Sequence, residues 1–227
     1  MAPATESHDP RRLAAARRFF SPGPRTLAFE PRDYPEWHRG RDRYAVWLID
    51  ADFAPLRDRV AQARAHLSGL LADAQRQPHV TVFVCGFLAE AAAWNDDFTP
   101  AMLVRQRQAL ARAGVGPFEL EVGGLASFDS AAFLDVGDPD GCLAPLRAAL
   151  AAGRDEVCRE EAYVPHLTVG LYREAFAKDE VVRRLAGFAD DAPVRLPVRR
   201  IDLAVYPARD HCGLLERRES FILRAGG

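Results

Sequence analysis

The sequence predicts an α+β fold in which two similar lobes, built from mostly antiparallel sheets with helices on their outer faces, enclose a central cleft. The first observation behind this prediction is a repeated pentapeptide, "PHVTV" at 78–82 and "PHLTV" at 165–169. The second is a repeated Pro-Leu-Arg segment ahead of each pentapeptide, "FAPLRDRV" at 53–60 and "LAPLRAAL" at 143–150. A strand-like run precedes each of these in turn, so the order strand, helix, strand occurs twice and indicates an internal duplication.

The first copy of this unit begins with the strand-like run "YAVWLIDA" at 44–51. A helix is expected over about 54–74, because Leu56, Val60 and the following apolar residues fall at helical spacing and Pro55 suits a first turn. The segment 79–87 then alternates in the way a strand does.

The region between the two copies is expected to hold a loop at 90–99 and a helix at about 100–113 that ends at Gly114. A β-hairpin follows, with strands at 118–128 and 131–136 and "DS" at its turn.

The second copy continues with a helix at 143–152 and a strand at 163–172. A helix near 177–188 comes next, and a closing hairpin joins 196–208 to 215–225. Since hairpins outnumber the crossovers, the strands are expected to be mostly antiparallel.

The domain organisation is expected to be simple. Residues 1–43 are rich in Pro, Arg and Gly and are expected to form an irregular N-terminal extension with one short helix near 10–20. No low-complexity linker divides the remainder, so 44–227 is expected to be one domain of two pseudo-symmetric lobes.

The composition is that of an ordinary globular protein with no membrane partner. A net charge of −2 and a pI near 6.3 argue against a large non-specific nucleic-acid surface. No apolar run approaches the 18 residues of a membrane span, and the N-terminus lacks the apolar core of a secretory signal. The four cysteines, Cys85, Cys142, Cys158 and Cys212, form no CxxC pair and are expected to be free thiols in a reducing compartment. We therefore expect a cytoplasmic protein, and a monomer.

The chemistry of the chain is expected at the two repeated motifs. Side chains alternate along a strand, so His79 and Thr81 point to one face, as His166 and Thr168 do in the second copy. If the two copies pack about a pseudo-two-fold axis, two imidazoles and two hydroxyls surround one small centre. That set suits displacement at a phosphodiester, with one histidine as base, the other as acid, and hydroxyls donating to phosphate oxygens.

The paired H-x-T motifs on strands of a duplicated α+β chain resemble the 2H phosphoesterase superfamily, and in particular its LigT-like branch of RNA 2′,3′-cyclic phosphodiesterases and 2′-5′ RNA ligases. The resemblance covers roughly 44–225 and assigns the two histidines and two threonines as catalytic residues. It implies a two-lobed fold around a water-filled cleft, and the opening or making of phosphodiesters at ribose 2′ and 3′ positions without a metal or other cofactor. Hydrolysis of a 2′,3′-cyclic phosphate on an RNA end or a small nucleotide to a 2′-phosphate is the reaction expected first.

Three further residues are candidates for substrate binding. Phe128 lies in "GLASFD", which resembles the family segment that lines the pocket, and Tyr163 precedes the second motif, where an aromatic ring can stack on a nucleobase. The family often has a basic residue shortly after the second motif, and here "GLYRE" delays it to Arg173.

Other interpretations stay open at this point. The substrate class also includes 2′-5′-linked oligonucleotides, made or cleaved, and cyclic ADP-ribose phosphate, and the chain could instead be a non-catalytic nucleotide- or RNA-binding module. A zinc site is disfavoured because neither motif brings a carboxylate or a third ligand. The remaining histidines have no matched partner in the sequence and are expected at the surface: His8, His38, His66 and His211.

Overall fold

The computed structural model describes residues 10–73, 76–153, 155–157, 162–188 and 192–224. His8 and Cys158 lie outside these ranges. The described strands form one curled nine-stranded sheet with the order β7-β4-β5-β6-β2-β1-β8-β9, and β3 pairs with β2 beside this path. All strand pairs are antiparallel except the short parallel pair of β2 with β3. The predicted α+β, mostly antiparallel fold is therefore confirmed.

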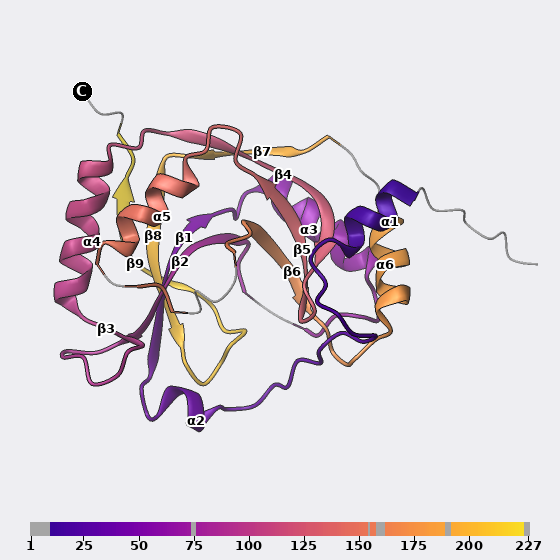
Figure 1. Ribbon diagram of the computed structural model, residues 1–227, viewed down its shortest axis with the longest axis horizontal. Helices are drawn as coiled ribbons and strands as arrows, with labels where there is room; N and C mark the ends of the chain where they lie inside the picture. The colour runs from indigo at the N-terminus through magenta and orange to yellow at the C-terminus, as the bar shows by residue number, and fades with distance from the viewer. Residues whose placement is uncertain (1–9, 74–75, 154, 158–161, 189–191, 225–227) are drawn as a thin grey trace, which may run out of the picture.

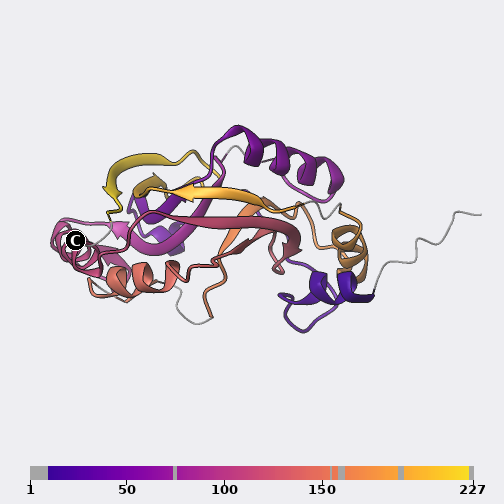
Figure 2. The ribbon, with the colours of Figure 1, turned by 90° about the horizontal axis from the view of Figure 1, so that it is seen from above.

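The helices and strands have the following bounds. The helices are α1 (Pro10–Arg17), α2 (Pro35–His38), α3 (Ala54–His66), α4 (Pro100–Ala113), α5 (Leu143–Ala151) and α6 (Lys178–Ala186). The strands are β1 (Arg43–Asp50), β2 (His79–Leu88), β3 (Asp97–Phe98), β4 (Phe118–Ser127), β5 (Ala131–Gly137), β6 (His166–Leu171), β7 (Val194–Val198), β8 (Arg200–Pro207) and β9 (Glu216–Ile222). Helices α4 and α5 pack together at one end of the sheet, and α1 packs with α6 at the other (Figures 1 and 2).

The duplicated unit occupies the middle of the sheet. The first copy is β1–α3–β2 and the second is β5–α5–β6, and the two meet where β2 pairs with β6. Each helix reaches the motif strand of the other copy. The Arg64 guanidinium of α3 donates to the Val169 carbonyl of β6 at 2.8 Å, and the Arg147 guanidinium of α5 donates to the Val82 carbonyl of β2. These crossed contacts tie the two copies together across the motif strands.

Helix α3 is shorter than predicted. It ends at His66 instead of continuing to residue 74. Leu67 caps it, and Gly69 has a φ of +86°, a left-handed conformation that a helix cannot include. Leu67 and Leu70 are nevertheless buried in the core. Their apolar spacing predicted a longer helix, but a turn places them in the core instead.

The predicted strand at 196–208 is also divided. Val194–Val198 pairs with β4 at one end of the sheet, whereas Arg200–Pro207 pairs with β1 and β9 at the other. Only Arg199 separates the two strands, so the sheet has to curl until these two regions meet. The curling makes one face of the sheet concave. The periodicity of the sequence does not predict this curling.

The N-terminal extension lies along this concave side. Backbone N–H groups of Leu27 and Phe29 donate to the carbonyls of Asp129 and Tyr172. The chain then runs across to α2, whose Trp37 packs on Tyr44 and Phe87 (Figure 1). The extension thus holds two helices, α1 and α2, where the sequence predicts one.

Within the described residues, no helix is long and apolar enough to cross a membrane. Cys85, Cys142 and Cys212 are free thiols, and Cys85 is buried in the core.

Candidate active site

The two H-x-T motifs lie side by side on the concave face. Val80 of β2 pairs with Leu167 of β6 in antiparallel register, and both are fully buried on the core side. Because the two strands run in opposite directions, the residues on either side of this pair also lie opposite each other. His79 therefore faces Thr168, and Thr81 faces His166. Cross-strand neighbours have Cβ atoms about 5 Å apart. Two imidazoles and two hydroxyls therefore gather at one centre, as the sequence predicted.

A bulge in β2 keeps the motif on the correct face. Leu48 pairs with Thr81, but the next residue of β1, Trp47, pairs with Phe83, so Val82 is an extra residue in β2. Val82 and Phe83 can therefore both point into the core, while Thr81 stays on the concave side.

Both imidazoles are held in the same way. Nδ1 of His79 lies 2.8 Å from the Gln77 carbonyl, and Nδ1 of His166 lies 2.8 Å from the Val164 carbonyl. A carbonyl only accepts, so Nδ1 carries the proton in each ring and Nε2 is left to exchange a proton with a substrate. The matched geometry arises because each histidine follows a proline that keeps the preceding residue extended.

The electrostatic surroundings of the two imidazoles differ. Burial lowers the pKa of His79 to about 4, against the effect of the Gln77 carbonyl, and the positive charge of Arg76 and the nearby His166 lower it further. Burial also lowers the pKa of His166, which the Val164 carbonyl opposes. Both rings are thus neutral at pH 7 in the absence of an anion.

Two cavities open beside His79. The larger, which we call the α3 cavity, has a volume of about 470 Å³. Its lining consists of Arg57, Val60, Ala61, Arg64, Arg76, Gln77, Pro78, His79, Thr81, Thr168, Val169, Gly170, Leu171, His211 and Cys212. Among the described residues no Asp or Glu lines it, so its three arginines make it cationic.

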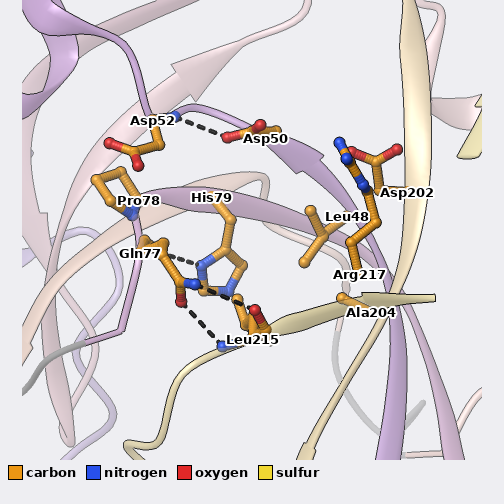
Figure 3. Close-up of a pocket in the computed structure, with 10 residues that line it drawn as sticks. All are labelled: Leu48, Asp50, Asp52, Gln77, Pro78, His79, Asp202, Ala204, Leu215 and Arg217. Atoms are coloured by element: carbon orange, nitrogen blue, oxygen red, sulfur yellow. Dashed lines mark hydrogen bonds between the residues drawn. The ribbon is translucent and has the colours of Figure 1, made fainter. Parts of the chain in front are cut away.

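The smaller cavity, which we call the β8 cavity, has a volume of about 170 Å³ and shares His79, Gln77 and Pro78 with the first (Figure 3). Asp50, Asp52 and Asp202 line it, together with Leu48, Ala204, Leu215 and Arg217. Figure 3 shows the Gln77 amide bound in both directions to the Leu215 backbone, which fixes the segment that carries the His79 anchor.

The three predicted substrate-binding residues have different surroundings. Phe128 packs edge-on against the His166 ring, with centroids 5.1 Å apart, and so lies at the centre. The Tyr163 hydroxyl donates to the Thr81 carbonyl at 2.9 Å, and the Arg147 guanidinium covers one face of its ring, so stacking of a base on Tyr163 stays a prediction. Arg173 pairs with Glu174 at 3.2 Å, is half exposed and does not line either cavity, and its contact with phosphate stays a prediction.

Sequence reasoning missed two residues of the α3 cavity, Arg76 and His211. Arg76 precedes the first motif instead of following the second. His211 was expected at the surface, but its ring packs against Trp37 and Tyr34 with centroids 4.5 and 4.8 Å apart. His38 was also expected at the surface and is 3% exposed, with its Nε2 2.9 Å from Asp33. An unmatched histidine gives no signal of such tertiary contacts.

No group of three or more His, Cys, Asp or Glu that could hold a metal ion occurs in the part of the chain that the structure describes. The imidazole and hydroxyl groups of the motifs are able to transfer protons and to donate hydrogen bonds.

Comparison with known proteins gives one family and a consistent fold. A model described as the 2′-5′ RNA ligase superfamily matches residues 52–210. No curated protein matches the chain. Escherichia coli LigT in complex with 3′-AMP is similar with a TM-score of 0.55 and 16% identity, over 80% of this chain and 98% of LigT.

Two further solved structures are similar over a comparable share of the chain. TT0787 of Thermus thermophilus has a TM-score of 0.50 and 16% identity, over 81% of this chain and 100% of its own. The protein of unknown function ATU0111 from Agrobacterium tumefaciens has a TM-score of 0.50 and 15% identity, over 81% and 86%. At these identities the likeness shows the fold.

Proposed function

The chain belongs to the 2′-5′ RNA ligase superfamily of 2H phosphoesterases, and on that basis we propose that it opens 2′,3′-cyclic phosphates on RNA ends or nucleotides to 2′-phosphates without a metal. The observation that carries the proposal is the pairing of β2 with β6, which brings both H-x-T motifs to one centre. The solved complex of LigT with 3′-AMP supports a nucleotide as the ligand class.

In the proposed reaction a water oxygen attacks phosphorus and the bond from phosphorus to the ribose 3′-oxygen breaks. One imidazole takes the proton of the water through Nε2, and the other gives a proton to the 3′-oxygen, so no net proton is lost. We assign the base to His79, because its lower pKa keeps it neutral and it lines both cavities. His166 is then the acid, and the approach of a phosphate anion favours its protonated form.

The two threonines hold the phosphate in this scheme. Thr81 and Thr168 project from the same face as the histidines and both line the α3 cavity. Their hydroxyls can donate to the non-bridging oxygens, where negative charge builds up in the transition state. Phe128 positions the acid by packing on the His166 ring.

The direct test is turnover of a nucleoside 2′,3′-cyclic phosphate in excess EDTA, with the product identified as the 2′- or 3′-phosphate. We expect a 2′-phosphate and undiminished activity. The profile of kcat/KM should be bell-shaped, with its maximum between pH 4 and 6.5, since His79 must be neutral and His166 charged in the free enzyme. Activity that EDTA removes and Mg²⁺ or Zn²⁺ restores would rule out the metal-free reaction.

A further inference from the structure

The α3 cavity holds positive charge that the two H-x-T motifs do not use. Two of its three arginines are engaged elsewhere. Arg57 pairs with Asp52 at 3.0 Å, and Arg64 donates to the carbonyls of Val169 and Ala72. The third, Arg76, makes one hydrogen bond, from Nε to the Gly213 carbonyl at 3.1 Å.

The Arg76 guanidinium is rigidly placed but incompletely satisfied. Its plane lies over the Tyr206 ring, with the central carbon 4.1 Å from the ring centroid. Its Nη2 is buried and has no hydrogen-bond partner. A buried donor on a charged group without a partner is costly, so such a group points to a ligand that completes it.

His211 lines the same cavity and has a second polar atom without a partner. Its Nε2 is buried without a hydrogen-bond partner, and the ring is fixed by Tyr34 and Trp37. The nearest carboxylates are occupied elsewhere, since Asp33 binds His38 and Asp210 accepts from the Cys212 backbone. Neither carboxylate lines the α3 cavity.

We infer that Arg76 and His211 form a second phosphate subsite, which takes the 5′-phosphate of the ribose whose cyclic phosphate is opened. The inference rests on the proposed function and narrows its substrate. The same cavity is lined by His79, Thr81 and Thr168, so a ligand held at the reaction centre can extend toward Arg76 and His211. The favoured substrates are then RNA ends and 5′-phosphorylated nucleotides, while nucleoside cyclic phosphates without a 5′-phosphate are poorer.

Equilibrium binding separates this subsite from the reaction itself. Adenosine 2′,5′-bisphosphate and adenosine 2′-monophosphate, measured by titration calorimetry, differ only in the 5′-phosphate. The wild-type protein should bind the bisphosphate about ten- to hundredfold more tightly, because each added contact is a charge-assisted hydrogen bond. Arg76→Gln should remove most of this ratio and leave the affinity for the monophosphate nearly unchanged, and His211→Gln should reduce the ratio by a smaller factor.

The control is Arg209→Gln, which removes one exposed positive charge from the same loop as His211 and should keep the wild-type ratio. Equal affinities in the wild type, or no binding of the bisphosphate, would overturn the subsite. A ratio that survives Arg76→Gln would overturn the role of Arg76, and an equal loss for both ligands would place Arg76 on the reacting phosphate instead. Turnover of simple cyclic nucleotides tests the proposed function separately, so the two failures are distinguishable.

Discussion

The two copies of the repeated unit hold their histidines with the same geometry but place them in different surroundings. In β1–α3–β2, His79 borders two cavities, and Arg76 contributes positive charge nearby. In β5–α5–β6, His166 packs against Phe128 and Phe133. The comparison teaches that the residues repeated in both copies set the position of each imidazole, while residues that differ between the copies set its surroundings.

The paired arginines of α3 and α5 show the same asymmetry. Arg64 and Arg147 each donate to the motif strand of the other copy. Arg147 also pairs with Glu156 at 2.5 Å, whereas no carboxylate pairs with Arg64 in the described part of the chain. The Arg147 charge is thereby compensated, whereas the α3 cavity keeps the positive charge of Arg64.

The largest expected effect comes from removing either imidazole. His79→Ala and His166→Ala should each lower kcat about 10²- to 10⁴-fold, because each removes one proton-transfer step. The double variant should be little worse than either single variant, since the two residues act as a unit. Steady-state kinetics on a 2′,3′-cyclic nucleotide measures this, and a single variant with a near wild-type rate would show that the copies are not both catalytic.

The next effect concerns the hydroxyls. Thr81→Val and Thr168→Val keep the β-branched shape and remove one donor to phosphate, which costs about 2–4 kcal/mol of transition-state stabilisation. We expect kcat to fall in both while the thermal unfolding temperature stays close to the wild-type value. Thr→Ser at the same positions is the matched control, and it should retain most of the rate because the hydroxyl is kept.

The assignment of base and acid sharpens the comparison of the copies. A 4-nitrophenyl phosphodiester releases a phenolate that needs no proton from an acid. For His166→Ala, the fold loss in kcat/KM on this substrate should be at least about tenfold smaller than the fold loss on a cyclic nucleotide. For His79→Ala, the fold loss should be the same on both substrates. The opposite result, with His79→Ala rescued, would exchange the two roles.

The last expected effect is on stability and not on the rate. The pKa of His79 is lower in the folded protein than its ordinary 6.5, so between pH 6.5 and 4 the unfolded chain binds more protons. The free energy of unfolding should therefore fall as the pH falls through this window, by about 3 kcal/mol from His79 for a shift from 6.5 to about 4. Urea denaturation at several pH values measures it, and His79→Gln should flatten the slope. If the free energy of unfolding of His79→Gln changed with pH as steeply as that of the wild type, the lowered pKa of His79 would be contradicted.

Much of the fold and the centre of the site could be predicted because the signals are local. Alternation in "HVTV" and "HLTV" places His and Thr on one face, and the hairpin at 118–136 follows from its turn. The helix that ends at Gly114 was predicted for the same reason, since a left-handed φ of +62° at its end favours glycine. Phe128 was predicted from its family segment, and its ring packs against that of His166, while its contact with substrate stays a prediction.

The sequence by itself determined the duplication, the mostly antiparallel α+β fold and the four motif residues that the paired strands bring together, because periodicity and repetition can be read along the chain. Only the tertiary structure decided that Arg76 and His211 line the α3 cavity while Arg173 does not. It also decided that the strand predicted at 196–208 divides at Arg199. The physical reason is the same in each case. Curling of the sheet and docking of the N-terminal extension bring together residues far apart in sequence, and their contacts depend on packing and burial that no local pattern encodes.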